Sequence, residues 1–103
     1  MVTYKVNDWG SGFTADVTIT NRSSSPVNGW RLQWTYAGNQ KVTGYWNSTI
    51  TQSGQQVTAS NTTWNGTIGA SGGTANFGFQ GSYSGANAAP TAFTLNGTAC
   101  TTG

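Results

Sequence analysis

The sequence contains no histidine, no glutamate and a single cysteine, Cys100, among its 103 residues. Without histidine there is no imidazole for a Ser–His–Asp triad or for most zinc sites. The only side-chain carboxylates belong to Asp8 and Asp16, and glycoside hydrolysis usually needs two held at a set separation across the bond. Nothing in the pattern marks either aspartate as buried. The sequence therefore predicts a protein that is not an enzyme and that binds no metal and no cofactor.

Charge and long apolar runs are also scarce. Charged residues make up 6% of the chain, and the net charge of +2 comes from four dispersed cations, Lys5, Arg22, Arg31 and Lys41. Nucleic-acid binding requires clustered cations, so we expect no nucleic-acid partner. No apolar run approaches the roughly 18 residues of a membrane span. The length fits one domain over residues 1–103.

Glycine, serine, threonine and asparagine are abundant, and apolar residues alternate with polar ones in several short segments. Phe13, Ala15, Val17 and Ile19, for example, share one parity of a segment whose other positions are polar. Alternation of this kind is typical of half-buried strands. The predicted strands cover residues 2–6, 13–19, 30–36, 41–46, 55–60, 74–80 and 91–97. About seven to nine short strands separated by turns predict an all-β antiparallel sandwich of jelly-roll or immunoglobulin-like type.

The strand phases predict a core that needs only two of the five tryptophans. Its members are Val2, Tyr4, Val6, Phe13, Ala15, Val17, Ile19, Trp30, Leu32, Trp34, Val57, Phe77, Phe79, Phe93 and Leu95. Trp9, Trp46 and Trp64 stand instead among small or polar neighbours. They are either satellite core residues under loops or parts of an exposed binding face, and their shared setting favours exposure. For Trp46 this requires a bulge near Gly44, because Val42 and Trp46 have the same parity.

Several motifs carry a resemblance to a known family. The resemblance is carried by the segments "VTYKVNDWGSGFTADVTITN" at 2–21, "NGWRLQW" at 28–34, "VTGYWN" at 42–47, "TTWNGTI" at 62–68, "FGFQG" at 77–81 and "NAAPTAFTLNGTAC" at 87–100. Their order and spacing are similar to those of the family 2 carbohydrate-binding modules. These are β-sandwich domains attached to secreted plant cell-wall hydrolases. The resemblance covers nearly the whole chain.

This resemblance implies a function and a site. By motif position Trp9, Trp46 and Trp64 would stack on crystalline cellulose, with chitin as a second ligand, and Asn7, Asp16, Asn76 and Gln80 would contact the sugar edges. The xylan-binding branch of the family carries an arginine where this chain has Gly12, which favours cellulose. The alternatives are a xylan-binding module or a sandwich domain that binds proteins. The predicted face has almost no charge, so binding should depend little on salt.

The resemblance also implies a secreted, monomeric domain that targets an attached catalytic domain to insoluble polysaccharide. The family usually pairs a cysteine ahead of the first strand with one near the end. Here Cys100 has no internal partner, so we expect a less stable domain. Cys100 would then be free to form an intermolecular disulfide.

Overall fold

The computed structural model describes residues 1–10, 12–62, 66–84, 90 and 92–100. The assigned elements are all strands: β1 (Val2–Asp8), β2 (Gly12–Asn21), β3 (Val27–Asn28), β4 (Arg31–Thr35), β5 (Lys41–Trp46), β6 (Thr49–Ser53), β7 (Gln56–Ser60), β8 (Thr67–Ile68), β9 (Gly73–Ser82), β10 (Phe93–Leu95) and β11 (Thr98–Ala99). Three of these eleven have only two residues, and the remaining eight fall within the predicted range. In the described part of the chain no helix could cross a membrane.

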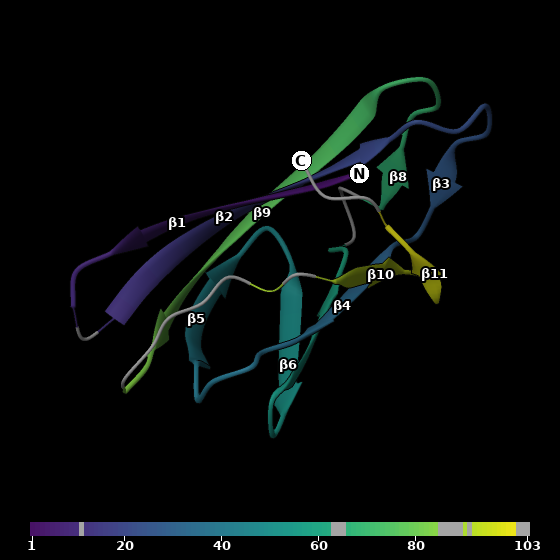
Figure 1. The fold of residues 1–103 in the computed structure, drawn as a ribbon. Coiled ribbons are helices and arrows are strands. Elements are labelled where there is room, and N and C mark those ends of the chain that lie inside the picture. The colour runs from purple at the N-terminus through teal and green to yellow at the C-terminus, as the bar shows by residue number, and fades with distance from the viewer. Residues whose placement is uncertain (11, 63–65, 85–89, 91, 101–103) are drawn as a thin grey trace.

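The strands form two larger antiparallel sheets and a small one. The first large sheet has the order β1-β2-β9-β5, the second the order β11-β10-β4-β7-β6, and β3 pairs with β8 (Figure 1). Long strands β1, β2 and β9 run side by side in Figure 1, with the second sheet packed across them. The all-β antiparallel sandwich predicted from strand phases is confirmed.

Aromatic rings fill the space between the two sheets. Trp30 stacks on Phe77 at a centroid distance of 5.4 Å, and Trp34 stacks on Phe79 at 5.6 Å. Both tryptophans are only 2% exposed. Such stacked pairs add to the stabilisation that burial of the large rings provides. Trp30 and Trp34 therefore have the core role that the alternation predicts.

The predicted core needs one correction and five additions. Val6 is 43% exposed, because β1 is an edge strand and Val6 lies close to its end, where little covers it. Tyr4 and Leu95 are partly buried against the core. Five buried residues are absent from the predicted list: Tyr36, Ile50, Ala59, Ile68 and Ala75. Ile50 was missed because β6, between turn-forming serines, was not predicted as a strand.

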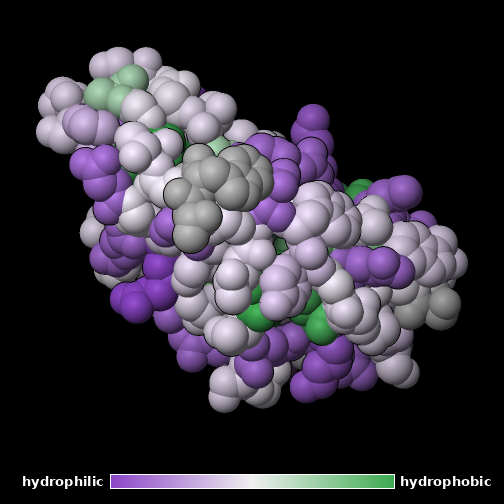
Figure 2. Space-filling model, turned by 180° about the vertical axis from the view of Figure 1, so that it is seen from behind, coloured by the Kyte–Doolittle hydropathy of each residue, from purple (hydrophilic) through white to green (hydrophobic). Residues whose placement is uncertain are grey.

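The visible surface is mostly hydrophilic or neutral in hydropathy. Figure 2 shows only small green areas among violet and white residues. Four large hydrophobic side chains are exposed in the described part of the chain: Val6, Trp9, Tyr45 and Trp46. Two of these are tryptophans that the core did not need.

Candidate functional site

The predicted polar site residues share the outer face of the β1-β2-β9-β5 sheet. Strand pairing places Asn7 opposite Thr14 and Thr14 opposite Gln80, and it places Thr18 opposite Asn76. Their neighbours along the strands, such as Val17 and Phe77, point into the core, and successive side chains alternate between faces. Asn7, Asp16, Asn76 and Gln80 are all exposed. We call this surface, from Lys5 and Asn7 across to Trp46, the outer face.

Trp9 occupies the turn between β1 and β2, at one end of the outer face. Its indole is 52% exposed. The Trp9 amide donates to the carbonyl of Gly12 at 3.0 Å, and Gly10 has a φ of 101°, which glycine adopts without strain. A Cβ on Gly12 would stand 3.0 Å from Cζ2 and Nε1 of the Trp9 ring. The indole therefore lies over Gly12, at the position where the xylan-binding branch has arginine.

Trp46 lies on β5 and points to the same face. Thr43 is an extra residue in the ladder, because the pairing of β5 with β9 shifts register between Val42 and Gly44. This bulge lets Val42 pack against the core while Trp46 turns outward, where it is 47% exposed. The predicted bulge is confirmed, and with it the exposure of Trp46.

Trp46 also rests against a glycine. It pairs with Gly78 across the ladder, and a Cβ on Gly78 would collide with Nε1, Cε2 and Cζ2 of the indole. The alternation of "FGFQ" places Phe77 and Phe79 in the core and leaves Gly78 beneath the ring. Gly78 was not singled out from the sequence, although its outward phase between two core phenylalanines was a readable signal.

The two indoles are offset along the strands. Trp9 lies over Gly12, and Trp46 lies over Gly78, which pairs with Asp16 four residues further along β2. At about 3.3 Å per residue the offset is roughly 13 Å. The third predicted ring, Trp64, lies outside the described residues.

Asn76 and Asp16 form a hydrogen-bonded pair at the centre of the outer face. Nδ2 of Asn76 donates to Oδ1 of Asp16 at 2.8 Å, to Oγ1 of Thr18 at 3.1 Å and to the Val17 carbonyl at 3.3 Å. These bonds hold the amide nitrogen of Asn76 against the sheet. Its Oδ1 atom is the group left to accept a hydrogen bond from a ligand.

The outer face carries more charge than predicted. Lys5 lies directly opposite Asp16, and Lys41 lies opposite Ser82 on the same face. Register decides this, because both lysines have the outward parity of their strands. The expectation of an almost uncharged face is therefore wrong, although the opposite charges of Lys5 and Asp16 offset each other.

Asp8 has a structural role that the sequence did not indicate. Its Oδ1 atom accepts a hydrogen bond from the Gly10 amide at 2.8 Å, inside the turn that carries Trp9. The Tyr83 hydroxyl donates to both carboxylate oxygens, at 2.7 and 2.9 Å. This hydrogen bond raises the pKa of Tyr83, with burial a smaller cause. Asp8 thus ties the Trp9 turn to the end of β9.

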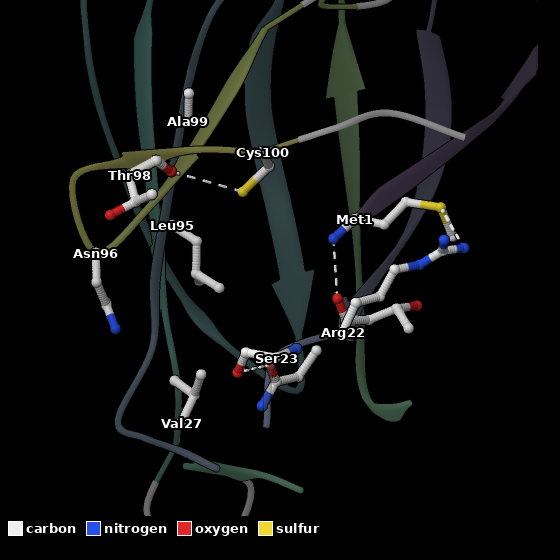
Figure 3. Close-up of a pocket in the computed structure, with 11 residues that line it drawn as sticks. Met1, Arg22, Ser23, Val27, Leu95, Asn96, Thr98, Ala99 and Cys100 are labelled. Atoms are coloured by element: carbon white, nitrogen blue, oxygen red, sulfur yellow. Dashed lines mark hydrogen bonds between the residues drawn. The ribbon is translucent and has the colours of Figure 1, made fainter. Parts of the chain in front are cut away.

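One surface hollow lies on the outer face, and a larger one lies away from it. One, of about 340 Å³, lies on the outer face and is lined by Trp46 with Lys5, Val6, Asn7, Thr14, Ala15 and Asp16. A larger one, of about 480 Å³, lies between Met1 and Cys100 (Figure 3), at the end of β1 opposite Trp9. The described residues contain no cluster of metal-binding side chains.

Cys100 is free and half-buried in the larger hollow. Its Sγ atom lies 3.7 Å from the Thr98 carbonyl, as Figure 3 shows. Burial raises the pKa of the thiol. Because the thiolate is the reactive form, this lowers the reactivity of Cys100 near neutral pH.

Comparison with known proteins places this geometry in a family. The family model described as "Cellulose binding domain" matches residues 1–100. Exoglucanase A of Cellulomonas fimi is 47% identical over 99% of this chain, and Exoglucanase B of the same organism is 50% identical over 97%. The chain spans only 12% and 9% of these two relatives.

A solved structure agrees with the sequence relatives. The solution structure of the chitin-binding domain of Chi18aC from Streptomyces coelicolor has a TM-score of 0.71 and 36% identity, covering 93% of this chain and 89% of that domain. The sandwich, the match over residues 1–100 and the half-exposed tryptophans agree on one assignment. The chain belongs to the cellulose-binding domain family, a family of carbohydrate-binding modules that are not themselves catalytic.

Proposed function

We propose that this chain binds crystalline cellulose, with chitin as a second ligand, through the outer face of the β1-β2-β9-β5 sheet. The observation that carries the proposal is that Trp9 and Trp46 are each about half exposed and each lie over a glycine. A neutral polysaccharide chain offers the matching surface, because a pyranose ring presents axial C–H groups on one face and hydroxyls around its edge. The indole faces would contact the C–H groups.

The polar residues of the outer face suit the edges of the sugar rings. Oδ1 of Asn76 accepts hydrogen bonds, the carboxylate of Asp16 accepts them, and Asn7 and Gln80 each both donate and accept. Hydroxyl groups can satisfy all of these. We include Trp64 as a third stacking ring on the family motif alone.

The rings set the scale of the binding energy. A buried tryptophan removes about 150–250 Å² from water, and half of that at about 25 cal/mol per Å² gives roughly 2.5 kcal/mol for each ring. Association costs at least about 4 kcal/mol. Two rings do little more than offset this cost, so stable retention requires the polar contacts and a further ring.

We further propose that the chain is one binding module of a longer secreted hydrolase. The two exoglucanase relatives support this, since this chain matches only a small part of each. The module would hold a catalytic domain of the same polypeptide near insoluble substrate. Xylan is the less favoured ligand, because Gly12 leaves the Trp9 ring lying over the sheet.

Depletion isotherms on microcrystalline cellulose test the proposal. Trp9→Ala and Trp46→Ala should each weaken binding about 10- to 100-fold, which corresponds to the loss of one ring. Tyr45→Ala is the matched control, because Tyr45 neighbours Trp46, is 49% exposed and lies on the other side of β5. It should bind like the unmodified chain.

Three outcomes would count against the proposal. Full cellulose affinity in Trp46→Ala would show that Trp46 does not stack on the ligand. A loss of affinity in Tyr45→Ala as large as that in Trp46→Ala would show that binding does not depend on which face of β5 carries the ring. No retention of the unmodified chain on cellulose, chitin or xylan would favour a protein-binding sandwich.

Melting curves should show Trp30→Ala destabilised by about 3–5 kcal/mol, since the substitution leaves a cavity at a buried site.

A further inference from the structure

The hollow beside Trp46 contains two opposite charges that do not pair with each other. Lys5 and Asp16 face each other across β1 and β2, and both line the hollow. Among the described residues no ion pair joins them. Oδ1 of Asp16 is occupied by Asn76, which leaves Oδ2 as the oxygen available to a ligand. The hollow therefore presents one ammonium donor and one carboxylate acceptor.

The hollow lies where a stacked sugar would project its substituents. Trp46 is both a lining residue of the hollow and the ring that rests against Gly78. The ring substituents of a β-1,4-linked glucose or N-acetylglucosamine are equatorial, so they extend sideways from a sugar stacked on Trp46. Those on one edge would extend over Lys5 and Asp16.

We propose that this hollow is a subsite for the acetamido group of an N-acetylglucosamine residue, which makes Lys5 and Asp16 determinants of chitin binding. The proposal rests on the function proposed above. The acetamido carbonyl would accept from Nζ of Lys5, and the acetamido N–H would donate to Oδ2 of Asp16. Hydrogen bonds to charged groups are stronger than those between neutral groups.

Other substituents fit the hollow less well. A water molecule takes about 30 Å³, so a volume of about 340 Å³ holds much more than a hydroxyl group. The ammonium of a free amine would pair with Asp16 but would be repelled by Lys5, and a uronic carboxylate would pair with Lys5 but would be repelled by Asp16. A neutral group with a separate donor and acceptor satisfies both charges at once.

Binding of Lys5→Met to two polymers tests the subsite. This change removes the ammonium and keeps most of the apolar stem of an exposed side chain. Isotherms on β-chitin should show affinity lowered about 3- to 10-fold, while affinity for microcrystalline cellulose should change less than about twofold. Lys41→Met is the matched control, because Lys41 is exposed on the same face but does not line the hollow. It should change neither isotherm by more than about twofold.

A second measurement locates the contact directly. In NMR titrations, chitohexaose should shift the backbone amide signal of Lys5 clearly more than cellohexaose or fully deacetylated chitohexaose does, whereas all three can shift the signal of Asp16. The subsite is overturned if Lys5→Met weakens chitin and cellulose binding equally, or weakens neither, while the unmodified chain still binds both. Failure of the unmodified chain to bind either polymer would overturn the proposed function as well.

Discussion

At the scale of single residues, the structure separates tryptophans by what lies beneath them. Trp30 and Trp34 stack on phenylalanines and are almost fully buried. Trp9 and Trp46 lie over Gly12 and Gly78 and stay about half exposed. A glycine gives the ring a surface to rest on without a side chain that would lift it. A ring that packs against the sheet has less conformational freedom to lose when a ligand binds, which reduces the entropic cost of binding.

Gly78→Val should weaken cellulose binding about 10-fold or more, because the new side chain would displace the Trp46 indole. The fold should persist, since the displaced ring can move into solvent. Gly44→Ala is the control, because a Cβ there meets nothing within 4 Å. Isotherms and tryptophan near-ultraviolet circular dichroism would check both variants. Unchanged binding and an unchanged spectrum in Gly78→Val would contradict the supporting role of Gly78.

At the scale of secondary-structure elements, one bulge determines which face of β5 carries tryptophan. Thr43 is the extra residue, and its hydroxyl donates to the Gln80 carbonyl at 3.2 Å. Gln52 holds the same region, accepting from the Val42 amide at 2.9 Å and donating to the Gln40 carbonyl at 2.7 Å. Bulges commonly re-aim side chains next to functional sites, and this one places Val42 inward and Trp46 outward.

Deleting Thr43 should therefore leave cellulose binding within about threefold of the unmodified chain, because Gly44, Tyr45 and Trp46 can keep their partners in an unbulged ladder. The matched comparison is insertion of one alanine after Thr43. That insertion gives the strand a second unpaired residue, and it should weaken binding more than the deletion does. If isotherms instead showed weaker cellulose binding for the deletion than for the insertion, the bulge itself would be required.

The turn between β1 and β2 depends on a second element for its position. Asp8 accepts from Gly10 within the turn and from Tyr83 at the end of β9. Tyr83→Phe removes the second contact, and we expect it to increase the mobility of Trp9 and to lower cellulose affinity a few-fold. In a Trp9→Ala background the same change should have no effect on affinity. An equal effect in both backgrounds would show that Tyr83 acts elsewhere.

At the scale of the whole molecule, Trp9 and Cys100 lie near opposite ends of β1. Trp9 follows β1, whereas Met1 precedes it and lines a hollow with Cys100 (Figure 3). The free thiol is therefore remote from the outer face along the strand. A disulfide between two copies at Cys100 would therefore form near the end of β1 opposite Trp9, one of the two described rings proposed to stack on the ligand.

We expect disulfide formation through Cys100 to be slow at neutral pH and to accelerate as the pH rises. Burial raises the pKa of the thiol, so the thiolate forms only at higher pH than for a free cysteine. Non-reducing gels after timed air oxidation at several pH values would measure the dimer fraction, with Cys100→Ser as the control. Fast dimerisation at neutral pH would contradict this expectation.

Much of the fold was readable from residue order, because the hydrophobic period in a strand is a local property. The segment 13–19 was predicted as a strand and lies within Gly12–Asn21, and the predicted inward residues Val17 and Phe77 are buried. The short β6 was missed because its apolar signal is almost limited to Ile50. Val6 was placed in the core wrongly, because alternation predicts a face but does not predict whether another sheet covers it.

Residue order alone also separated the tryptophans into two groups and led to the family, since its motifs are local strings. Tertiary pairing decided the remaining features. The register of β5 on β9 turned Trp46 outward, and the register of β1 on β2 placed Lys5 opposite Asp16. Gly78 lies under Trp46 although 32 positions separate them in the chain. Contacts of this kind depend on which strands become neighbours, and the local pattern of one strand carries no information about its partner.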